Sequence, residues 1–142
     1  MERIAGAIQH YDWGSVTAIP ELLGSPPTGE PQAELWFGTH PRGPAEVRRG
    51  DHNVSLAEVI ASDPNGQLGV GRRELTFLAN VLAAAKPLSI QAHPDRTQAE
   101  AGYAHEDELH IPVDAFERSF RDRNPKPELI CALTPFEALC GF

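Results

Sequence analysis

The clearest alternation of hydrophobic and polar positions runs from Lys86 to Asp95. Successive side chains of a β-strand point to opposite faces, so one face here would be apolar and the other polar. The apolar face consists of Leu88, Ile90 and Ala92, and the polar face consists of Ser89, Gln91 and His93. The first set would pack in a core, while the second places a hydroxyl, an amide and an imidazole in a row. Because proline cannot donate to a strand ladder, we predict that this strand ends just before Pro94.

Other apolar runs predict further strands. Ile4–Ile8 is a short apolar run, and Ala33–Phe37 is a predicted strand that residues 38–44 break. A third run begins at Glu128 and alternates through Leu133. The stretch Glu74–Ala85 fits both a helical period and a strand buried on both faces, and periodicity alone does not decide between them.

Helix signals are few and local. Ile19–Leu23 has the length of about one helical turn, and capping boxes at Ser55–Glu58 and Thr97–Glu100 predict two short helices. We expect residues 63–66, Asp-Pro-Asn-Gly, to stop the first of these two, and the second to end near Ala104. Thirteen prolines and twelve glycines cut the chain into short elements, which favours a mainly β, loop-rich fold with short helices.

Composition and charge narrow the class of protein. With 41% hydrophobic and 23% charged residues, the 142-residue chain is typical of one globular domain. A net charge of -8 and a pI of about 5.1 argue against nucleic acid or an anionic membrane surface as the partner. We expect a cytoplasmic protein, since no secretory signal or membrane-spanning apolar run is visible. The two cysteines, Cys131 and Cys140, make no disulfide framework, and we expect Cys131 to be buried.

Three polar residues form a candidate metal site. Gln91 and His93 are two positions apart and would share one strand face, and Glu128 would add a carboxylate from a neighbouring strand. An acid that begins an apolar strand is costly unless it is paired or bound to metal. Mixed oxygen and nitrogen ligands suit zinc, with manganese and iron as competitors. The alternative is a structural role in which these side chains only hydrogen-bond to their neighbours.

Four motifs occur in one order along the chain: Tyr11–Ser15, Ala33–Pro41, Ala84–Asp95 and Lys126–Phe136. Together they resemble the type I mannose-6-phosphate isomerase (phosphomannose isomerase) family, in order and in separation, over essentially the whole chain. The resemblance implies a cupin-type jelly-roll β-barrel. Residues 1–142 would be the N-terminal, incomplete part of that catalytic barrel, without the family's helical domain and second barrel. The resemblance also favours a strand, from about Thr76, in the ambiguous stretch Glu74–Ala85.

The resemblance further implies an enzyme that interconverts mannose 6-phosphate and fructose 6-phosphate with one zinc ion. By resemblance, Gln91, His93 and Glu128 fall on three of four zinc ligands. Ser89 falls on a contact to the substrate phosphate, and Lys126 on a lysine that lines the active site. The chemistry agrees with these residues: the reaction passes through an enediol, whose negative charge zinc can stabilise, and a lysine can hold an oxyanion or transfer a proton. The expected partner is therefore a small sugar phosphate.

The sequence also departs from the family pattern. The fourth zinc ligand and an arginine near the reacting carbons would lie outside these residues, so we expect the chain to be a truncated portion. Pro125 stands where the family usually has a histidine, and Asn80 stands where it usually has a lysine. Both losses lie on the substrate side, so metal binding should survive better than turnover. The competing hypothesis is a degenerate cupin module that binds metal or sugar phosphate without turnover.

Overall fold

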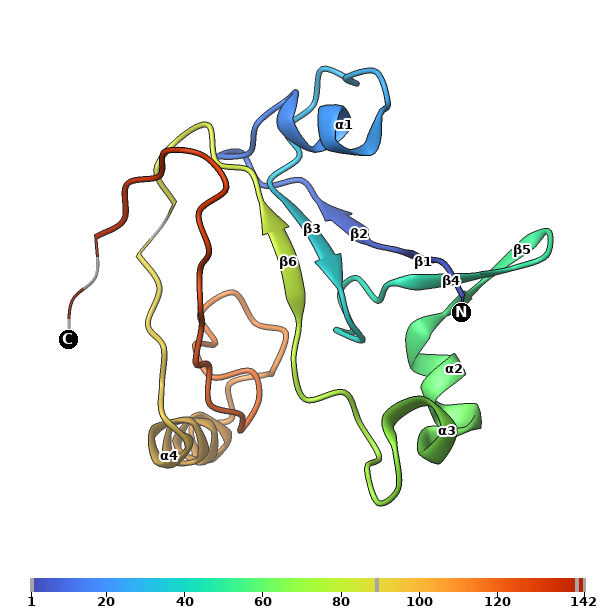
Figure 1. Cartoon of the computed structure of the whole chain (residues 1–142). Coiled ribbons are helices and arrows are strands. Elements are labelled where there is room, and N and C mark those ends of the chain that lie inside the picture. The colour runs from blue at the N-terminus through green and yellow to red at the C-terminus, as the bar shows by residue number, and fades with distance from the viewer. Residues whose placement is uncertain (1, 89, 140, 142) are drawn as a thin grey trace. The chain divides into compact units, whose positions relative to one another are not determined.

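The computed structural model describes residues 2–88, 90–139 and 141. They divide into a first compact unit up to residue 89 and a second from residue 90 (Figure 1). In the part of the chain that is described, no helix has the length and hydrophobicity needed to cross a membrane.

One antiparallel sheet carries the core of the first unit. Its strands, in spatial order, are β2 (Ala7–Gln9), β3 (Glu34–Phe37) and β6 (Ala79–Leu82). In the central strand β3, Leu35 is 2% exposed and lies opposite Ile8 on one side and Val81 on the other. Ile19, from helix α1 (Ala18–Leu23), is fully buried against this cluster, so the short helix covers the middle of the sheet.

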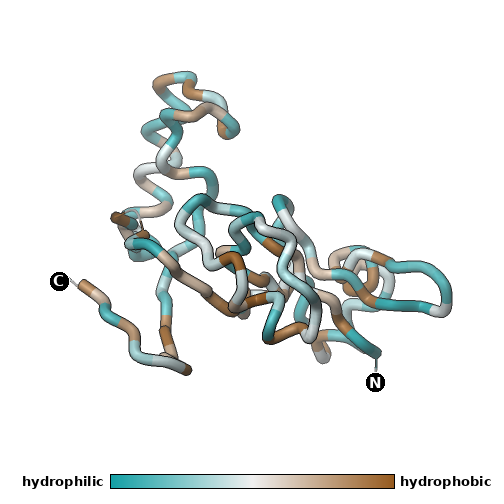
Figure 2. Tube along the Cα trace, turned by 90° about the horizontal axis from the view of Figure 1, so that it is seen from above, coloured by the Kyte–Doolittle hydropathy of each residue, from teal (hydrophilic) through white to brown (hydrophobic). Residues whose placement is uncertain are grey.

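A second antiparallel sheet lies in the same unit. Its strands, in spatial order, are β1 (Ile4–Ala5), β4 (Glu46–Arg49) and β5 (His52–Ser55). The chain passes from this sheet to the first one at Gly6, where a Cβ atom would lie 2.8 Å from Leu35 Cδ1. The turn between β4 and β5 is hydrophilic (Figure 2) and contains Gly50 at a φ of 61°, which favours glycine. Sequence patterns missed the two strands that this turn joins.

Two short helices follow, α2 (Leu56–Ser62) and α3 (Pro64–Leu68). The prediction of α2 is confirmed: Ser55 Oγ accepts a hydrogen bond from the backbone of Ala57, and Val59 is buried. The predicted stop at residues 63–66 ends α2 but also begins α3. Proline is tolerated in the first helical turn, and the Asp63 side chain caps the new helix by accepting from Gly66 N.

The second unit contains helix α4 (Arg96–Glu108). Asp95 and Gln98 form a reciprocal capping box, with distances of 2.8 and 2.9 Å. The predicted helix is therefore confirmed, but its start at Thr97 and its end near Ala104 are wrong. A carboxylate at the helix N-terminus is favoured over a hydroxyl because it also interacts with the helix dipole.

The strands predicted at Lys86–His93 and from Glu128 are wrong. The described residues of both segments are irregular, and their apolar side chains are not in a core: Ile90 is fully exposed and Leu129 is 98% exposed. Cys131 is exposed rather than buried. Alternation produces a strand only where another strand supplies hydrogen-bond partners, and none of the described strands pairs with either segment.

The ambiguous stretch Glu74–Ala85 contains a strand, as the resemblance favoured, but β6 begins at Ala79 rather than near Thr76. The prediction of a mainly β fold with short helices is confirmed. The described strands form two open three-stranded sheets and no closed barrel.

Candidate functional site

Four of the predicted site residues lie together in the second unit. The ammonium of Lys126 is central, because Nζ lies 3.2 Å from Gln91 Oε1 and 3.2 Å from Glu128 Oε1. The other carboxylate oxygen, Glu128 Oε2, lies 3.0 Å from His93 Nε2. The fifth predicted residue, Ser89, lies outside the described residues. The predicted cluster therefore forms within irregular segments rather than on neighbouring strands.

Local backbone constraints hold the two segments in place. The backbone N–H of Lys126 donates to Pro94 O at 3.1 Å, which joins the segment before α4 to the later one. Pro125 and Pro127 flank Lys126, and each ring fixes its own φ and restricts the residue before it. The backbone of Lys126 is therefore held while its long side chain keeps its rotatable bonds.

The cluster is open to solvent. The side chains of His93, Lys126 and Glu128 are 39%, 52% and 53% exposed. Partial burial raises the pKa of the Glu128 carboxyl, but hydrogen bonds from His93 and Lys126 outweigh it, so the pKa lies below its usual value. Exposed ion pairs contribute only about 0 to 1 kcal/mol each to stability. These contacts therefore add little to the stability of the fold.

The donor atoms fit a zinc ion. Among the described residues, no group of three or more His, Cys, Asp or Glu is placed to hold a metal. The candidate set has two such residues, and its third donor is the amide oxygen of Gln91. Gln91 Oε1 and Glu128 Oε1 converge on one positive charge, the Lys126 ammonium, and an imidazole nitrogen lies beside them. Such a mixed oxygen and nitrogen set is one that zinc uses in proteins.

A buried arginine ties α4 to the loop that leads to this cluster. Arg118 is 3% exposed, and its guanidinium donates to three main-chain carbonyls and pairs with two carboxylates. The carbonyls belong to Tyr103, Ile111 and Phe120, and the carboxylates to Glu106 and Asp107. The backbone N–H of Ser119 lowers the pKa of Glu106; burial opposes this, and Phe120 N–H and Arg118 support it. The contacts of Arg118 thus fix residues 111–120 against α4.

In the first unit, sequence patterns missed Glu34. This carboxylate is 9% exposed, and its Oε2 accepts hydrogen bonds from Trp36 Nε1 and, at 3.0 Å, from Asn80 Nδ2. The signal was present, since Glu34 and Trp36 are two positions apart in a predicted strand and share one face. The acid faces Asn80, the position where the resemblance expects lysine.

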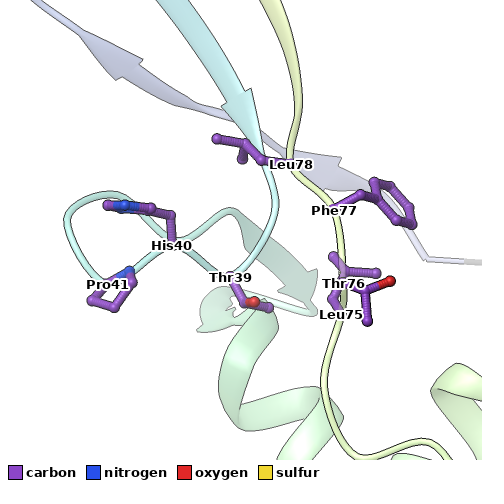
Figure 3. Close-up of a pocket in the computed structure, with 7 residues that line it drawn as sticks. All are labelled: Thr39, His40, Pro41, Leu75, Thr76, Phe77 and Leu78. Carbon is purple, nitrogen blue, oxygen red and sulfur yellow. The ribbon is translucent and has the colours of Figure 1, made fainter. Parts of the chain in front are cut away.

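A shallow pocket of about 250 Å³ also lies in the first unit. Thr39, His40 and Pro41 line one side, and residues 75–78 line the other (Figure 3). The ring of Phe77 points away from His40, and the residue as a whole is 65% exposed. His40 packs edge-on against Trp36, with 4.8 Å between ring centroids. None of the predicted site residues that the structure describes lines this pocket.

Relatives cover the whole chain. Residues 1–142 match the family model "Phosphomannose isomerase type I, catalytic domain". The mannose-6-phosphate isomerase of Escherichia coli (strain K12) is 47% identical over 148 residues, covering 100% of this chain and 38% of that protein. The Homo sapiens mannose-6-phosphate isomerase is 39% identical over 153 residues, covering 96% and 33%. The chain thus spans less than two-fifths of the length of these curated relatives.

Solved structures agree. A zinc-bound mannose 6-phosphate isomerase superposes with a TM-score of 0.78 at 40% identity, covering 87% of this chain and 33% of that one. The Salmonella typhimurium enzyme with fructose 6-phosphate and zinc gives a TM-score of 0.76, with the same identity and coverage. The fold is therefore that of an incomplete cupin-type isomerase barrel. The chain belongs to the phosphomannose isomerase type I family, as its motifs indicated.

Proposed function

We propose that this chain carries metal ligands and a lysine of a zinc-dependent isomerase that interconverts mannose 6-phosphate and fructose 6-phosphate. The observation that carries the proposal is the convergence of Gln91 Oε1 and Glu128 Oε1 on one cationic group, with His93 Nε2 beside them. The names of the relatives support the same reaction.

Gln91, His93 and Glu128 would hold the metal through one amide oxygen, one imidazole nitrogen and one carboxylate. A bound zinc ion supplies a Lewis acid that polarises sugar oxygens and stabilises negative charge. Lys126, about half exposed, can reach a substrate and hold an oxyanion or move a proton at Nζ. We assign Ser89 to the phosphate group, whose binding energy orients the sugar for reaction.

A second candidate function is a module that binds metal or sugar phosphate without turnover. Pro125 favours it, because proline offers neither an acid nor a base beside Lys126. Asn80 favours it as well, because its amide is neutral and already donates to Glu34. Neither change removes one of the candidate ligands Gln91, His93 and Glu128, so metal binding would persist in this module.

One experiment separates these functions. The purified chain is incubated with zinc and mannose 6-phosphate, and bound metal and fructose 6-phosphate are both measured, alongside a His93→Ala variant and an exposed control, His52→Ala. Stoichiometric metal with product, both lost only in His93→Ala, supports the isomerase. Metal without product supports the binding module. If no metal binds, or if His93→Ala binds it as well as His52→Ala does, the isomerase and the metal-binding module are both refuted.

A further inference from the structure

We infer that Lys126 is a resident competitor for the metal: its ammonium holds the oxygens of Gln91 and Glu128, and a divalent cation displaces it toward an anionic ligand. The inference rests on the proposed function, because it takes Gln91 and Glu128 as metal ligands. It adds an exchange of one cation for another at the same oxygen atoms.

The distances place the two cations in competition. Lys126 Nζ lies 3.2 Å from Gln91 Oε1 and 3.2 Å from Glu128 Oε1. A zinc ion on either oxygen, at about 2.1 Å, would lie within about 5 Å of that ammonium. Two positive centres at such a separation repel each other strongly. The metal and the ammonium therefore cannot both stay on these oxygens at low cost.

The exchange requires little rearrangement. The Lys126 and Glu128 side chains are 52% and 53% exposed, so water can replace the contacts that the ammonium loses. The stem of Lys126 has four flexible carbons. Its backbone is held by Pro125, Pro127 and the hydrogen bond to Pro94 O. The ammonium can therefore swing away without moving the carboxylate two residues later.

The displaced ammonium keeps a defined place. Because its backbone is fixed, Nζ stays within one lysine side-chain length of the metal ligands, next to where an oxygen of the ligand would approach. The negative charge of the Glu128 carboxylate, which pairs with the ammonium, would then also bind the metal. The ammonium would therefore attract another anion. The chemistry that would recognise it is an oxyanion or a phosphate group. Metal binding and anion binding are thereby coupled through one side chain.

The first test measures zinc affinity in competition with a chromophoric chelator. Removing the competing cation in Lys126→Met should tighten zinc binding about tenfold at unchanged stoichiometry. Lys126→Arg keeps the cation and should stay within about twofold of the unchanged chain. The control Lys86→Met removes the same charge from an exposed residue, whose backbone N–H donates to Trp13 O, and zinc affinity should not change.

The second test needs no substitution. The chain contains two lysines, Lys86 and Lys126, so selective carbon-13 labelling of lysine gives two resolvable sets of side-chain signals. Titration with zinc should shift the ε-methylene signal of Lys126 up to one equivalent and leave that of Lys86 unchanged. Adding inorganic phosphate afterwards should shift Lys126 again, whereas phosphate without zinc should shift it less.

The outcomes distinguish the two ideas. Zinc that binds equally to the unchanged chain and to Lys126→Met, or less tightly to Lys126→Met, overturns the exchange but leaves the proposed function standing. A Lys126 signal that ignores bound zinc also overturns the exchange. Absence of zinc binding in the unchanged chain and in Lys126→Met alike overturns the proposed function together with the inference.

Discussion

Replacing Arg118 by methionine should destabilise the second unit and leave the stability of the first unit unchanged. The side chain is fully buried, and its shortest hydrogen bonds, to the carbonyls of Ile111 and Phe120, are 2.6 and 2.7 Å long. Hydrogen bonds to charged groups contribute about 1.5 to 3 kcal/mol each, and methionine leaves both carbonyls unpaired. The opening free energy of residues 96–121 should therefore fall by about 3 kcal/mol or more, which is roughly a hundredfold in the opening equilibrium.

Native-state hydrogen exchange read by mass spectrometry measures this locally. Peptides that cover α4 and residues 111–121 should exchange faster in Arg118→Met, while peptides that cover β3 should not. Tryptophan fluorescence would miss the change, because Trp13 and Trp36 both lie in the first unit. The matched control is Arg96→Met, whose side chain is 66% exposed and pairs with Glu100 of the same helix. That variant should change the opening free energy by less than about 0.5 kcal/mol.

Equal protection of residues 96–121 in Arg118→Met and Arg96→Met would refute the reasoning. It would mean that water or neighbouring groups satisfy the carbonyls once the guanidinium is gone. Faster exchange in β3 would refute a different step, the assignment of this arginine to the second unit alone.

Three further predictions concern other parts of the chain. Backbone N–H donors keep the pKa of Glu106 below its usual 4.5. The contribution of Glu106 to stability should therefore be complete above about pH 4.5 and should be lost as the pH falls through the lowered pKa. Urea midpoints measured from about pH 5 to about pH 3 would reveal this loss. Gly14→Ala should destabilise the first unit by about 2 kcal/mol, followed by tryptophan fluorescence, because its Cβ would lie 2.5 Å from Ala33 N. The double variant Asn80→Lys, Pro125→His should raise formation of fructose 6-phosphate at least about tenfold, because it restores a cation and an acid–base group.

Each of these has a control. Glu106→Gln should flatten the acid-side slope, and exposed Glu108→Gln should leave it unchanged; equal slopes in both would contradict the assignment. Gly141→Ala, with nothing within 4 Å of its added Cβ, should be neutral. For the double variant, zinc affinity should stay unchanged, and a gain in product that depended on tighter metal binding would speak against the reasoning.

Several secondary-structure elements were predictable from local sequence signals. Strand β3 was predictable because Leu35 and Phe37 precede a glycine that ends the run, and α2 because Ser55 caps it. The predicted start of α4 was wrong because the sequence contains two overlapping capping boxes, Asp95–Gln98 and Thr97–Glu100. Sequence alone does not show that Asp95 is the residue that accepts the capping hydrogen bond. Short-range chemistry thus located β3, α2 and α4 to within about four residues.

Long-range pairing was not readable in the same way. The alternation around Gln91 and His93 describes two faces, but a strand also needs a neighbour, and the described strands supply none there. The membership of the cluster was predicted from spacing and resemblance. The position of Lys126 between Gln91 and Glu128 was not, because it depends on which rotamer a flexible side chain adopts. Glu34 was missed because the apolar residues next to it in the motif Ala33–Pro41 indicated only a buried strand.

The central place of β3 has a consequence during synthesis. Its partner β2 leaves the ribosome before it, whereas its other partner, β6, is made much later. Until residues 79–82 emerge, a nascent chain can pair only one side of β3, and the other side presents unpaired backbone groups. Such an edge can template pairing with another chain. Translation speed between residues 38 and 82 should therefore govern how much of the newly made protein aggregates before it folds.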